Sequence, residues 1–427
     1  MAIEILDALA CTDQPLDRFL RDWFRTRRFA GSKDRAAIAE RVFDIVRHRA
    51  SYGWRMGCEM PRALAIASLL KDGEAPDTYF CGEGYGPSAL DDAERQAIAA
   101  PPDGDPLLSV QGEFPQFLEP ELTRAFGADL LAEMQSLQAR APVDLRVNTL
   151  KRSRDEVLEE LHSGGFVGAE ATPFSPVGLR FASASAALGT STLFESGAFE
   201  FQDEAAQIAA LLCAAKPGER VLDIAAGAGG KSLALAALMQ NKGEIVACDI
   251  RQTALQQLAL RATRAGAGII RTHLSNPDPP EGLFDAVLVD APCSGTGTWR
   301  RQPEQRWRLT PETLAARMAT QDALIDDAAV RVRAGGRLIY ATCSVLPCEN
   351  EDRIAAFLAR HAEFTVRPCA DLWRESVDTT VPKGMARFFK ASPRTTGTDG
   401  FFTCVMERTT RFGEVVPVAR CASKSTR

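Results

Sequence analysis

Two cysteines and an aspartate are the residues whose types and placing suit covalent chemistry. An apolar run at 286–289 predicts a short buried strand, and Asp290 and Cys293 follow at its carboxyl end. A second run from 337 predicts another strand, which ends at Cys343. Open α/β sheets bind ligands at the carboxyl ends of their strands. Because a thiolate there can attack an electron-poor carbon, the pattern predicts catalysis by a nucleophilic thiol.

A glycine-rich turn at 226–231 predicts a nucleoside site. It follows a predicted strand at 221–225, and Asp249 ends the next predicted strand, where it can accept hydrogen bonds from ribose hydroxyls. The turn also resembles the tail of a phosphate-binding loop. That motif needs a glycine where this chain has Ala225, so nucleoside-triphosphate binding is not expected. A dehydrogenase would not need the acid and thiol that follow at 290–293.

The elements that must position these residues alternate between strand and helix. Predicted helices at 232–239, 253–264 and 311–331 separate the strands named above. Such alternation predicts an α/β fold with a Rossmann-like parallel sheet. The front, 12–60, carries apolar residues at helical spacing, 71–105 is expected to contain loops, and 145–150 alternates as a strand. We therefore divide the chain into a helical domain (1–138), a small α+β module (139–205), a Rossmann-like domain (206–410) and a loose tail (411–427).

Composition indicates an ordinary soluble protein. Hydrophobic residues make up 45% and charged residues 25%, and no apolar run reaches the length of a membrane helix. The 11 cysteines lack paired spacing, which favours reduced thiols in a cytoplasm, and neither they nor the 4 histidines suggest a metal site. The net charge is −6, but 18–55 holds 11 basic against 4 acidic residues. That block fits either nucleic-acid contact or a solvated helix face. We expect a monomer with no membrane contact.

The motifs together resemble a known family. The runs at 290–297, 342–344 and 349–351 look like the fingerprint of the Nop/Sun family of RNA 5-methylcytosine methyltransferases, and 221–231 and 397–402 agree with it. The segment at 27–35, with 52–54 after it, resembles the NusB-like helical RNA-binding domain that precedes some rRNA methyltransferases. The whole chain therefore resembles the RsmB type, which methylates small-subunit (16S) rRNA.

The resemblance implies a role for each strand-end residue. Cys343 would be the nucleophile that adds to C6 of cytosine, after which C5 takes the methyl group of S-adenosyl-L-methionine. Cys293 would assist breakdown of the adduct, and Asp290 would hydrogen-bond the base at N3. Lys231 would add positive charge and lower a thiol pKa. The alternative allocation, with Cys293 attacking, remains open from the sequence.

The cofactor-binding residues that the resemblance implies are Ala225, Ala226, Gly227, Ala228, Gly229, Gly230, Lys231, Asp249, Asn276 and Asp290. Two of these positions depart from the family. The turn lacks the usual proline, although its small residues keep the close backbone approach. An acid expected near the adenine is replaced by Asn276, which can still hydrogen-bond.

RNA contacts are expected from residues on both sides of the thiols. Arginines and tryptophans follow Cys293, and such side chains can contact phosphates and stack on bases; they are Trp299, Arg300, Arg301, Arg306, Trp307 and Arg308. A helix cap with inward tryptophans is the structural alternative. Arg146 and Asn148 are expected to touch the RNA backbone. Two other functions stay open: a tRNA cytosine-C5 methyltransferase, or a noncatalytic RNA-binding assembly factor, which the altered turn alone favours.

Overall fold

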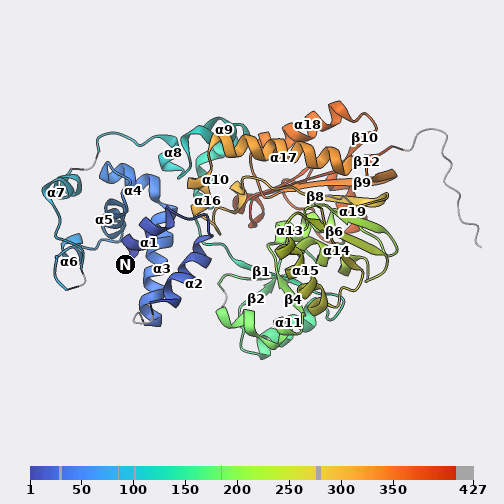
Figure 1. The fold of residues 1–427 in the computed structure, drawn as a ribbon, viewed down its shortest axis with the longest axis horizontal. Coiled ribbons are helices and arrows are strands. Elements are labelled where there is room, and N and C mark those ends of the chain that lie inside the picture. The colour runs from blue at the N-terminus through green and yellow to red at the C-terminus, as the bar shows by residue number, and fades with distance from the viewer. Residues whose placement is uncertain (28–30, 85, 101, 184, 276–279, 410–427) are drawn as a thin grey trace, which may run out of the picture.

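The computed structural model describes residues 1–27, 31–84, 86–100, 102–183, 185–275 and 280–409. A group of helices from the N-terminal part lies at one end of the molecule and a large sheet with its helices at the other (Figure 1). A smaller sheet lies below the large one in this view. The predicted tail, 411–427, and Asn276 lie outside the described residues.

The front of the chain is helical, as predicted. Leu16, Leu20 and Phe24 recur at helical spacing and are buried, so the second helix turns one apolar face inward. Two short helices occur within 71–105, a stretch expected to contain loops. The helices are α1 (Ala2–Leu9), α2 (Leu16–Arg25), α3 (Ser32–Arg47), α4 (Arg49–Met56), α5 (Pro61–Lys71), α6 (Pro76–Tyr79) and α7 (Asp92–Ala99).

A second set of helices joins this front to the rest. Its apolar side chains form a cluster with Trp299, Leu314 and Leu346 from the large domain, so the connection is packed rather than loose. The set comprises α8 (Leu108–Gln111), η1 (Gln116–Leu118), α9 (Glu119–Phe126), η2 (Gly127–Asp129) and α10 (Leu130–Ser136).

The small α+β module is built on a four-stranded sheet of order β2-β3-β1-β4, in which every pair is antiparallel. A capping box at Ser153 begins its main helix, since Ser153 and Glu156 satisfy each other's backbone N–H groups. Its elements are β1 (Val143–Val147), α11 (Arg154–Ser163), β2 (Ala169–Ala171), β3 (Gly178–Phe181), η3 (Ala186–Thr190), α12 (Thr192–Glu195) and β4 (Phe199–Phe201).

The large sheet confirms the predicted Rossmann-like fold. Its order is β10-β12-β9-β8-β5-β6-β7, and β7, β6, β5, β8 and β9 run parallel. Strand β12 is antiparallel to both β9 and β10, and β11 pairs with β12. The strands are β5 (Arg220–Asp223), β6 (Glu244–Asp249), β7 (Ile270–Leu274), β8 (Phe284–Asp290), β9 (Val332–Thr342), β10 (Phe364–Arg367), β11 (Phe389–Ala391) and β12 (Phe401–Arg408).

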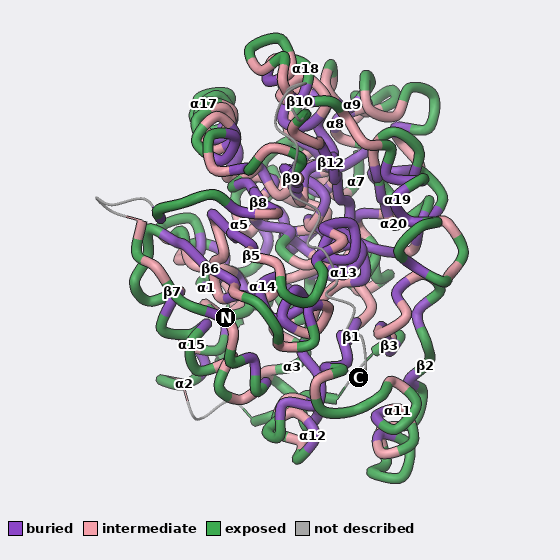
Figure 2. The backbone as a smooth tube through the Cα atoms, turned by 90° about the vertical axis from the view of Figure 1, so that its right-hand side faces the viewer, coloured by how far each residue is buried: buried purple, intermediate pink, exposed green. Residues whose placement is uncertain are grey.

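Helices cover both faces of this sheet, and two separate apolar clusters result. The central strands are buried along most of their length (Figure 2). The chain runs outward from β5 to β7 and then returns to β8, so the order reverses between β5 and β8, where such sheets bind ligands. The helices are α13 (Glu204–Leu211), α14 (Gly230–Leu238), α15 (Gln252–Ala265), η4 (Thr296–Thr298), α16 (Glu304–Arg308), α17 (Pro311–Ala329), η5 (Pro347–Glu349), α18 (Glu351–Arg360), α19 (Cys369–Ser376) and α20 (Pro393–Thr396).

Candidate active site

The structure brings the two strand-end thiols together. Strands β8 and β9 are parallel neighbours, with Asp290 opposite Ala341, so the loops that follow them leave the sheet side by side. The Sγ atoms of Cys293 and Cys343 lie 3.4 Å apart, and both residues are half-buried. Two sulfurs this close can reach the same atom or adjacent atoms of one small ring.

The pair is electrostatically unequal. The hydrogen bond to Cys343, and then burial, raise the pKa of the Cys293 thiol well above its ordinary value. The raised pKa favours the protonated thiol of Cys293, while either sulfur can be the donor in the hydrogen bond between them. This arrangement suits Cys343 as the nucleophile and Cys293 as a proton-bearing neighbour.

Lys231 and Asp290 form an ion pair beside the thiols. The Lys231 Nζ lies 2.6 Å from the Asp290 Oδ2, and the lysine is only 8% exposed. Burial opposes the lysine's charge, but the nearby carboxylates outweigh it and raise the pKa of Lys231. The ammonium is thus permanently charged and held by Asp290. The expected lowering of a thiol pKa by Lys231 is not seen at Cys293, whose pKa is raised.

A buried carboxylate fixes the loop that carries Cys293. Glu349 is fully buried and accepts hydrogen bonds from the Ser294 Oγ at 2.5 Å, the Ser294 N at 2.8 Å and the Gln321 Nε2 at 3.0 Å. Gln321 also donates to the Pro292 carbonyl at 3.0 Å. Sequence reasoning used Glu349 only as part of a fingerprint, because its partners are far away along the chain.

The loop after Cys343 is fixed in a similar way. Asn350 accepts from the Thr342 hydroxyl at 2.6 Å and donates to the Ser344 carbonyl at 2.9 Å. Gly297 has its backbone against Gly400, where an added Cβ would lie 2.1 Å from a carbonyl oxygen. Only glycine allows this approach, so the glycines after the first thiol lock its loop onto the chain just before β12.

The glycine-rich turn has the geometry of a nucleoside site. Gly227 and Gly229 adopt φ of +56° and +84°, which other residues rarely adopt, and Gly229 directly precedes α14. Asp249, buried at the end of β6, accepts from the Gly227 N at 2.9 Å. Burial opposes its ionisation, but hydrogen bonds from Arg251 outweigh burial and lower its pKa. The carboxylate is therefore ionised at the point where a ribose would lie.

One buried oxygen at this edge lacks a partner. Asp223 ends β5; its Oδ2 accepts from the Ser232 hydroxyl at 2.6 Å, while its Oδ1 has no hydrogen-bond partner. Burial raises the pKa of Asp223 to about 7. An unpaired acceptor of this kind is costly unless a ligand donates to it. A ligand that carries both an ammonium group and ribose hydroxyls would satisfy this oxygen together with Asp249.

Most of the expected RNA contacts after Cys293 are wrong, and the structural alternative holds. Trp299 and Arg306 are fully buried. Arg300 is buried too, and its Nε lies 2.5 Å from Asp399. The two other arginines make interdomain bonds: Arg301 donates to Asp203 and to the Pro142 carbonyl, and Arg308 donates to the carbonyls of Asp13 and Gln14. The arginines that the sequence suggested for phosphate contact therefore hold domains together instead.

The expected contacts of Arg146 and Asn148 with the RNA backbone are also wrong. Both side chains are buried. Arg146 donates to the Gln202 side chain and, at 2.5 Å, to the Gly230 carbonyl, while Asn148 donates to the Ala265 carbonyl at 2.8 Å. These residues attach the small module to the cofactor turn and to α15.

Helix α16, which follows the Cys293 loop, docks into the N-terminal helices. The Glu304 carboxylate accepts from the Leu16 N at 3.2 Å, at the first turn of α2. The Trp307 Nε1 donates to the Val46 carbonyl at 2.7 Å, close to the end of α3. The helical front is thereby bonded to the segment that follows the Cys293 loop.

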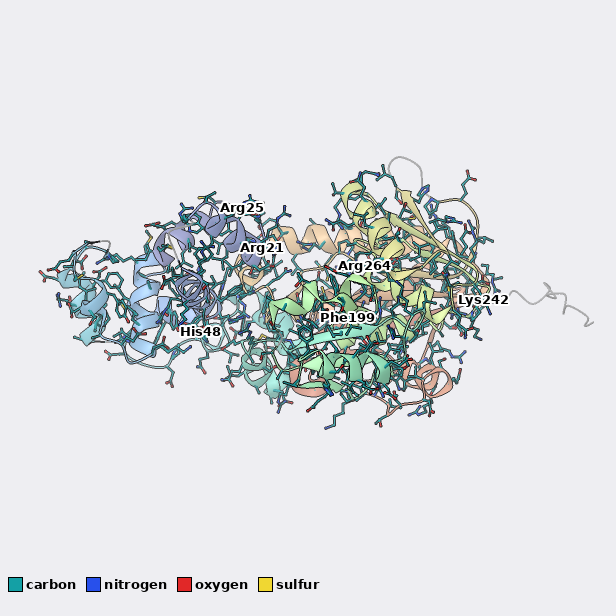
Figure 3. All side chains as sticks on the ribbon, turned by 90° about the horizontal axis from the view of Figure 1, so that it is seen from below. Arg21, Arg25, His48, Phe199, Lys242 and Arg264 are labelled. Carbon is teal, nitrogen blue, oxygen red and sulfur yellow. The ribbon has the colours of Figure 1, made fainter. Side chains whose placement is uncertain are left out.

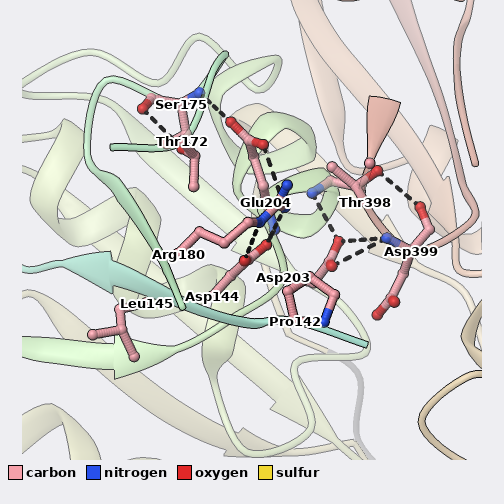
Figure 4. A network of polar contacts seen from close by, with 12 residues as sticks. Pro142, Asp144, Leu145, Thr172, Ser175, Arg180, Asp203, Glu204, Thr398 and Asp399 are labelled. Carbon is pink, nitrogen blue, oxygen red and sulfur yellow. Dashed lines mark hydrogen bonds and ion pairs between the residues drawn. The ribbon is translucent and has the colours of Figure 1, made fainter. Parts of the chain in front are cut away.

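A polar network joins the small module to the start of β12 (Figure 4). Asp203 accepts from the Asp399 N at 3.1 Å, and burial followed by the charge of Asp399 raises the pKa of Asp203 to about 6. Arg180 pairs with Asp144 at 2.6 Å and lies 3.6 Å from Glu204. The module is therefore bonded to the chain just before β12 of the large sheet.

Only part of the basic block of the front lies on the surface. Arg21 and Arg25, labelled in Figure 3, pair with Asp17 and Asp22 of the same helix at 3.4 and 3.5 Å. Such exposed pairs are weak and exchange readily with phosphates. Among the residues that the structure describes, no cluster of three or more metal-binding side chains occurs. In the same described ranges, no helix has the length and apolarity to cross a membrane.

Comparisons with known proteins agree on one family. The model of the 16S rRNA methyltransferase RsmB/F family matches residues 210–407, and that of the RsmF/B-like ferredoxin-like domain matches 114–187. The "Probable ribosomal RNA small subunit methyltransferase B" of Synechocystis is 34% identical over 310 residues, which cover 70% of this chain and 68% of the relative. The protein of that name from Bacillus subtilis is 31% identical, and the match covers 71% of this chain and 69% of the relative.

Solved structures show the same fold. The crystal structure of PH0851 matches with a TM-score of 0.76 at 26% identity and covers 95% of this chain and 97% of that one. The structure of NSun6 from Pyrococcus horikoshii, solved with SFG, matches with a TM-score of 0.61 at 22% identity and covers 70% of this chain and 99% of its own.

Proposed function

Because the chain belongs to the RsmB/F family of 16S rRNA methyltransferases, we propose that it methylates C5 of a cytosine in small-subunit rRNA through a covalent cysteine adduct. Membership in the family establishes two general points: the protein is an rRNA methyltransferase, and its cofactor is S-adenosyl-L-methionine. The observation that supports the finer proposal is the 3.4 Å approach of two thiols beside a carboxylate.

The residues at the glycine turn fit this cofactor. Asp249 would hold the ribose hydroxyls, the free oxygen of Asp223 would take the ammonium group, and the 225–231 turn would pass along the nucleoside. When bound, S-adenosyl-L-methionine supplies an electrophilic methyl group at the switch point of the sheet.

Cys343 begins the reaction in this proposal. Its thiolate forms a bond to C6, the ring electrons move to C5, and Asp290 hydrogen-bonds the base at N3 and stabilises its protonated form. Lys231 orients Asp290 through their 2.6 Å ion pair. C5, now electron-rich, accepts the methyl group.

Cys293 acts in the second half. Loss of the C5 proton to a base restores the ring double bond and expels the Cys343 sulfur. The protonated Cys293 thiol donates a hydrogen bond to that departing sulfur, which lowers the energy of the thiolate. The raised pKa of Cys293 supports this allocation over the alternative, in which Cys293 attacks.

The remaining sequence-based expectations belong to this proposal. The protein acts as a cytoplasmic monomer, its N-terminal helices are NusB-like and bind RNA through the basic block at 18–55, and the domains divide after 138, 205 and 410. The support is the exposure of Arg21 and Arg25 and the separate sheet of 143–201.

Two cysteine substitutions test the mechanism. We expect Cys343→Ala to abolish methyl transfer to rRNA, and Cys293→Ala to accumulate a protein–RNA adduct that survives denaturing electrophoresis. Cys348→Ala is the matched control, because Cys348 is nearby but not paired with a thiol, and burial raises its pKa to about 12. Near-normal turnover by Cys343→Ala would contradict the allocation.

A second experiment identifies the RNA. Bisulfite mapping of 5-methylcytosine in rRNA and tRNA, from cells with and without the gene, should show one or more sites lost from small-subunit rRNA. Loss from tRNA alone would favour the tRNA enzyme instead.

A further inference from the structure

The glycine turn has little in its own sequence to fix its shape. Residues 225–231 include three glycines and no proline, and Gly227 and Gly229 have positive φ. Glycine leaves the backbone more conformational freedom than any other residue, and proline leaves it the least. A turn of this composition therefore depends on bonds from other parts of the chain to keep a single shape.

Two arginines supply such bonds. The Arg261 Nη1, on α15, donates to the Ala228 carbonyl at 2.6 Å. The Arg146 Nη1, on β1, donates to the Gly230 carbonyl at 2.5 Å. Because a carbonyl oxygen lies in one plane with the N–H of the next residue, each bond orients a whole peptide group of the turn. The second of these peptide groups includes the backbone nitrogen of Lys231.

The small module holds one of these arginines in place. Glu200, on β4, is buried, and its Oε2 lies 2.9 Å from the Arg261 Nη2. Its Oε1 pairs with Arg264 at 2.5 Å, one turn further along α15. The module also holds the end of α15, since Asn148 donates to the Ala265 carbonyl at 2.8 Å (Figure 1). The Arg261 guanidinium thus lies between a carboxylate of the module and a carbonyl of the turn.

Packing and charge favour both bonds. An added Cβ on Gly229 would lie 2.4 Å from the Leu258 Cγ, so α15 packs closely against the turn. Leu258 and Arg261 are three residues apart and lie on the same face of that helix. Burial lowers the pKa of Arg146 to about 10, and the charge of Glu200 opposes that shift. Arg146 is therefore charged at neutral pH, which strengthens its hydrogen bond to the turn.

We propose that Arg261 and Arg146 are positioning residues that hold the glycine turn in the shape that binds S-adenosyl-L-methionine, and that Glu200 acts through Arg261. The inference rests on the proposed placement of the cofactor at this turn. It gives the small module a part in cofactor binding, because Arg146 and Glu200 both belong to the sheet of that module.

Calorimetry with S-adenosyl-L-methionine on the full-length protein tests the proposal. Arg261→Met keeps an unbranched side chain but removes the donor, so it should weaken cofactor binding by about tenfold. The Arg261 side chain is 24% exposed, so the change leaves no large buried void. Arg264→Met is the matched control, because Arg264 pairs with the same Glu200 but packs on Phe194 rather than on the turn. It should leave the dissociation constant unchanged.

Steady-state kinetics separate positioning from a general loss of structure. Arg261→Met should raise the KM for the cofactor by about tenfold, with little change in kcat or in the KM for rRNA. Glu200→Gln should weaken cofactor binding by about threefold, because the neutral amide holds Arg261 less firmly. The double variant should bind no more weakly than Arg261→Met alone, since Glu200 acts through that arginine.

The results that overturn the proposal differ from those that refute the placement of the cofactor. Wild-type affinity in Arg261→Met, an equal loss in Arg264→Met, or losses that add in the double variant would overturn it. Failure of the wild-type protein to bind S-adenosyl-L-methionine, or wild-type affinity in Asp249→Ala, would instead show that the cofactor does not bind at this turn.

Discussion

Substitution of Glu349 tests whether loop support, as well as the thiols themselves, sets the rate. Glu349 receives three hydrogen bonds, two of them from Ser294, the residue after Cys293. In Glu349→Ala the Ser294 N–H is left buried without an acceptor, and a void forms in a fully buried site. Hydrogen bonds to a charged acceptor contribute about 1.5–3 kcal/mol each. With the void, and because the bonds are not additive, we expect a loss of about 4 kcal/mol in unfolding free energy.

Glu349→Gln provides the graded comparison. The amide oxygen can still accept from the Ser294 N, and the amide nitrogen can donate to the Ser294 Oγ after the hydroxyl rotates. The expected loss is about 1 kcal/mol. A double-mutant cycle with Ser294→Ala should give a coupling energy between about 0.5 and 3 kcal/mol, since the two side chains share one network.

The assay measures urea unfolding together with methyl transfer and adduct lifetime. If Glu349 positions the Cys293 loop, Glu349→Ala should lower kcat and prolong the covalent adduct, as a milder form of Cys293→Ala, while RNA affinity changes little. A variant that loses stability yet keeps wild-type kcat and adduct lifetime would refute the link between this carboxylate and Cys293.

Two further predictions concern the cofactor edge. Burial raises the pKa of Asp223 to about 7, so between about pH 4 and pH 7 the folded protein keeps a proton that the unfolded chain has lost. The free energy of unfolding should therefore fall as pH rises across that window, by on the order of 4 kcal/mol. Asp223→Asn should remove this pH dependence in urea titrations. Saturating cofactor should flatten the slope in wild type, and an identical pH profile for both proteins would contradict the assignment. The Arg251 side chain is 66% exposed and lies 3.0 Å from the Asp249 carboxylate, where it competes with the cofactor. Arg251→Ala should therefore tighten cofactor binding by up to about fivefold, and Asp249→Ala should weaken it. Calorimetry measures both dissociation constants. Tighter binding by the Asp249 variant would argue against a ribose contact there.

The parts of the fold that sequence reasoning predicted are those set by local pattern. The strands ending at Asp290 and Cys343 were found because apolar runs precede them, and parallel pairing then places their ends together. The glycine turn and Asp249 were found for the same reason. The expected strand at 145–150 is displaced to Val143–Val147, because these residues are the ones that pair with β3 and β4.

The errors arise from contacts between residues distant along the chain. Arg306 has the composition of a phosphate-binding residue but donates to the carbonyls of Glu113 and Leu137 and is fully buried. Nothing local distinguishes an arginine in a domain interface from one on an RNA-binding surface. The contacts of Glu349 with the Cys293 loop were not predicted, because an acidic residue reads as exposed until the tertiary structure shows what surrounds it.

The docking of α16 has a consequence for protein engineering. Since α16 follows the Cys293 loop and is bonded to the start of α2 and the end of α3, the N-terminal helices support that loop. Removing the N-terminal helices would expose Glu304 and Trp307 to water and leave one end of that loop without support. A chimaeric protein in which another domain replaces the N-terminal helices must therefore have α16 replaced as well.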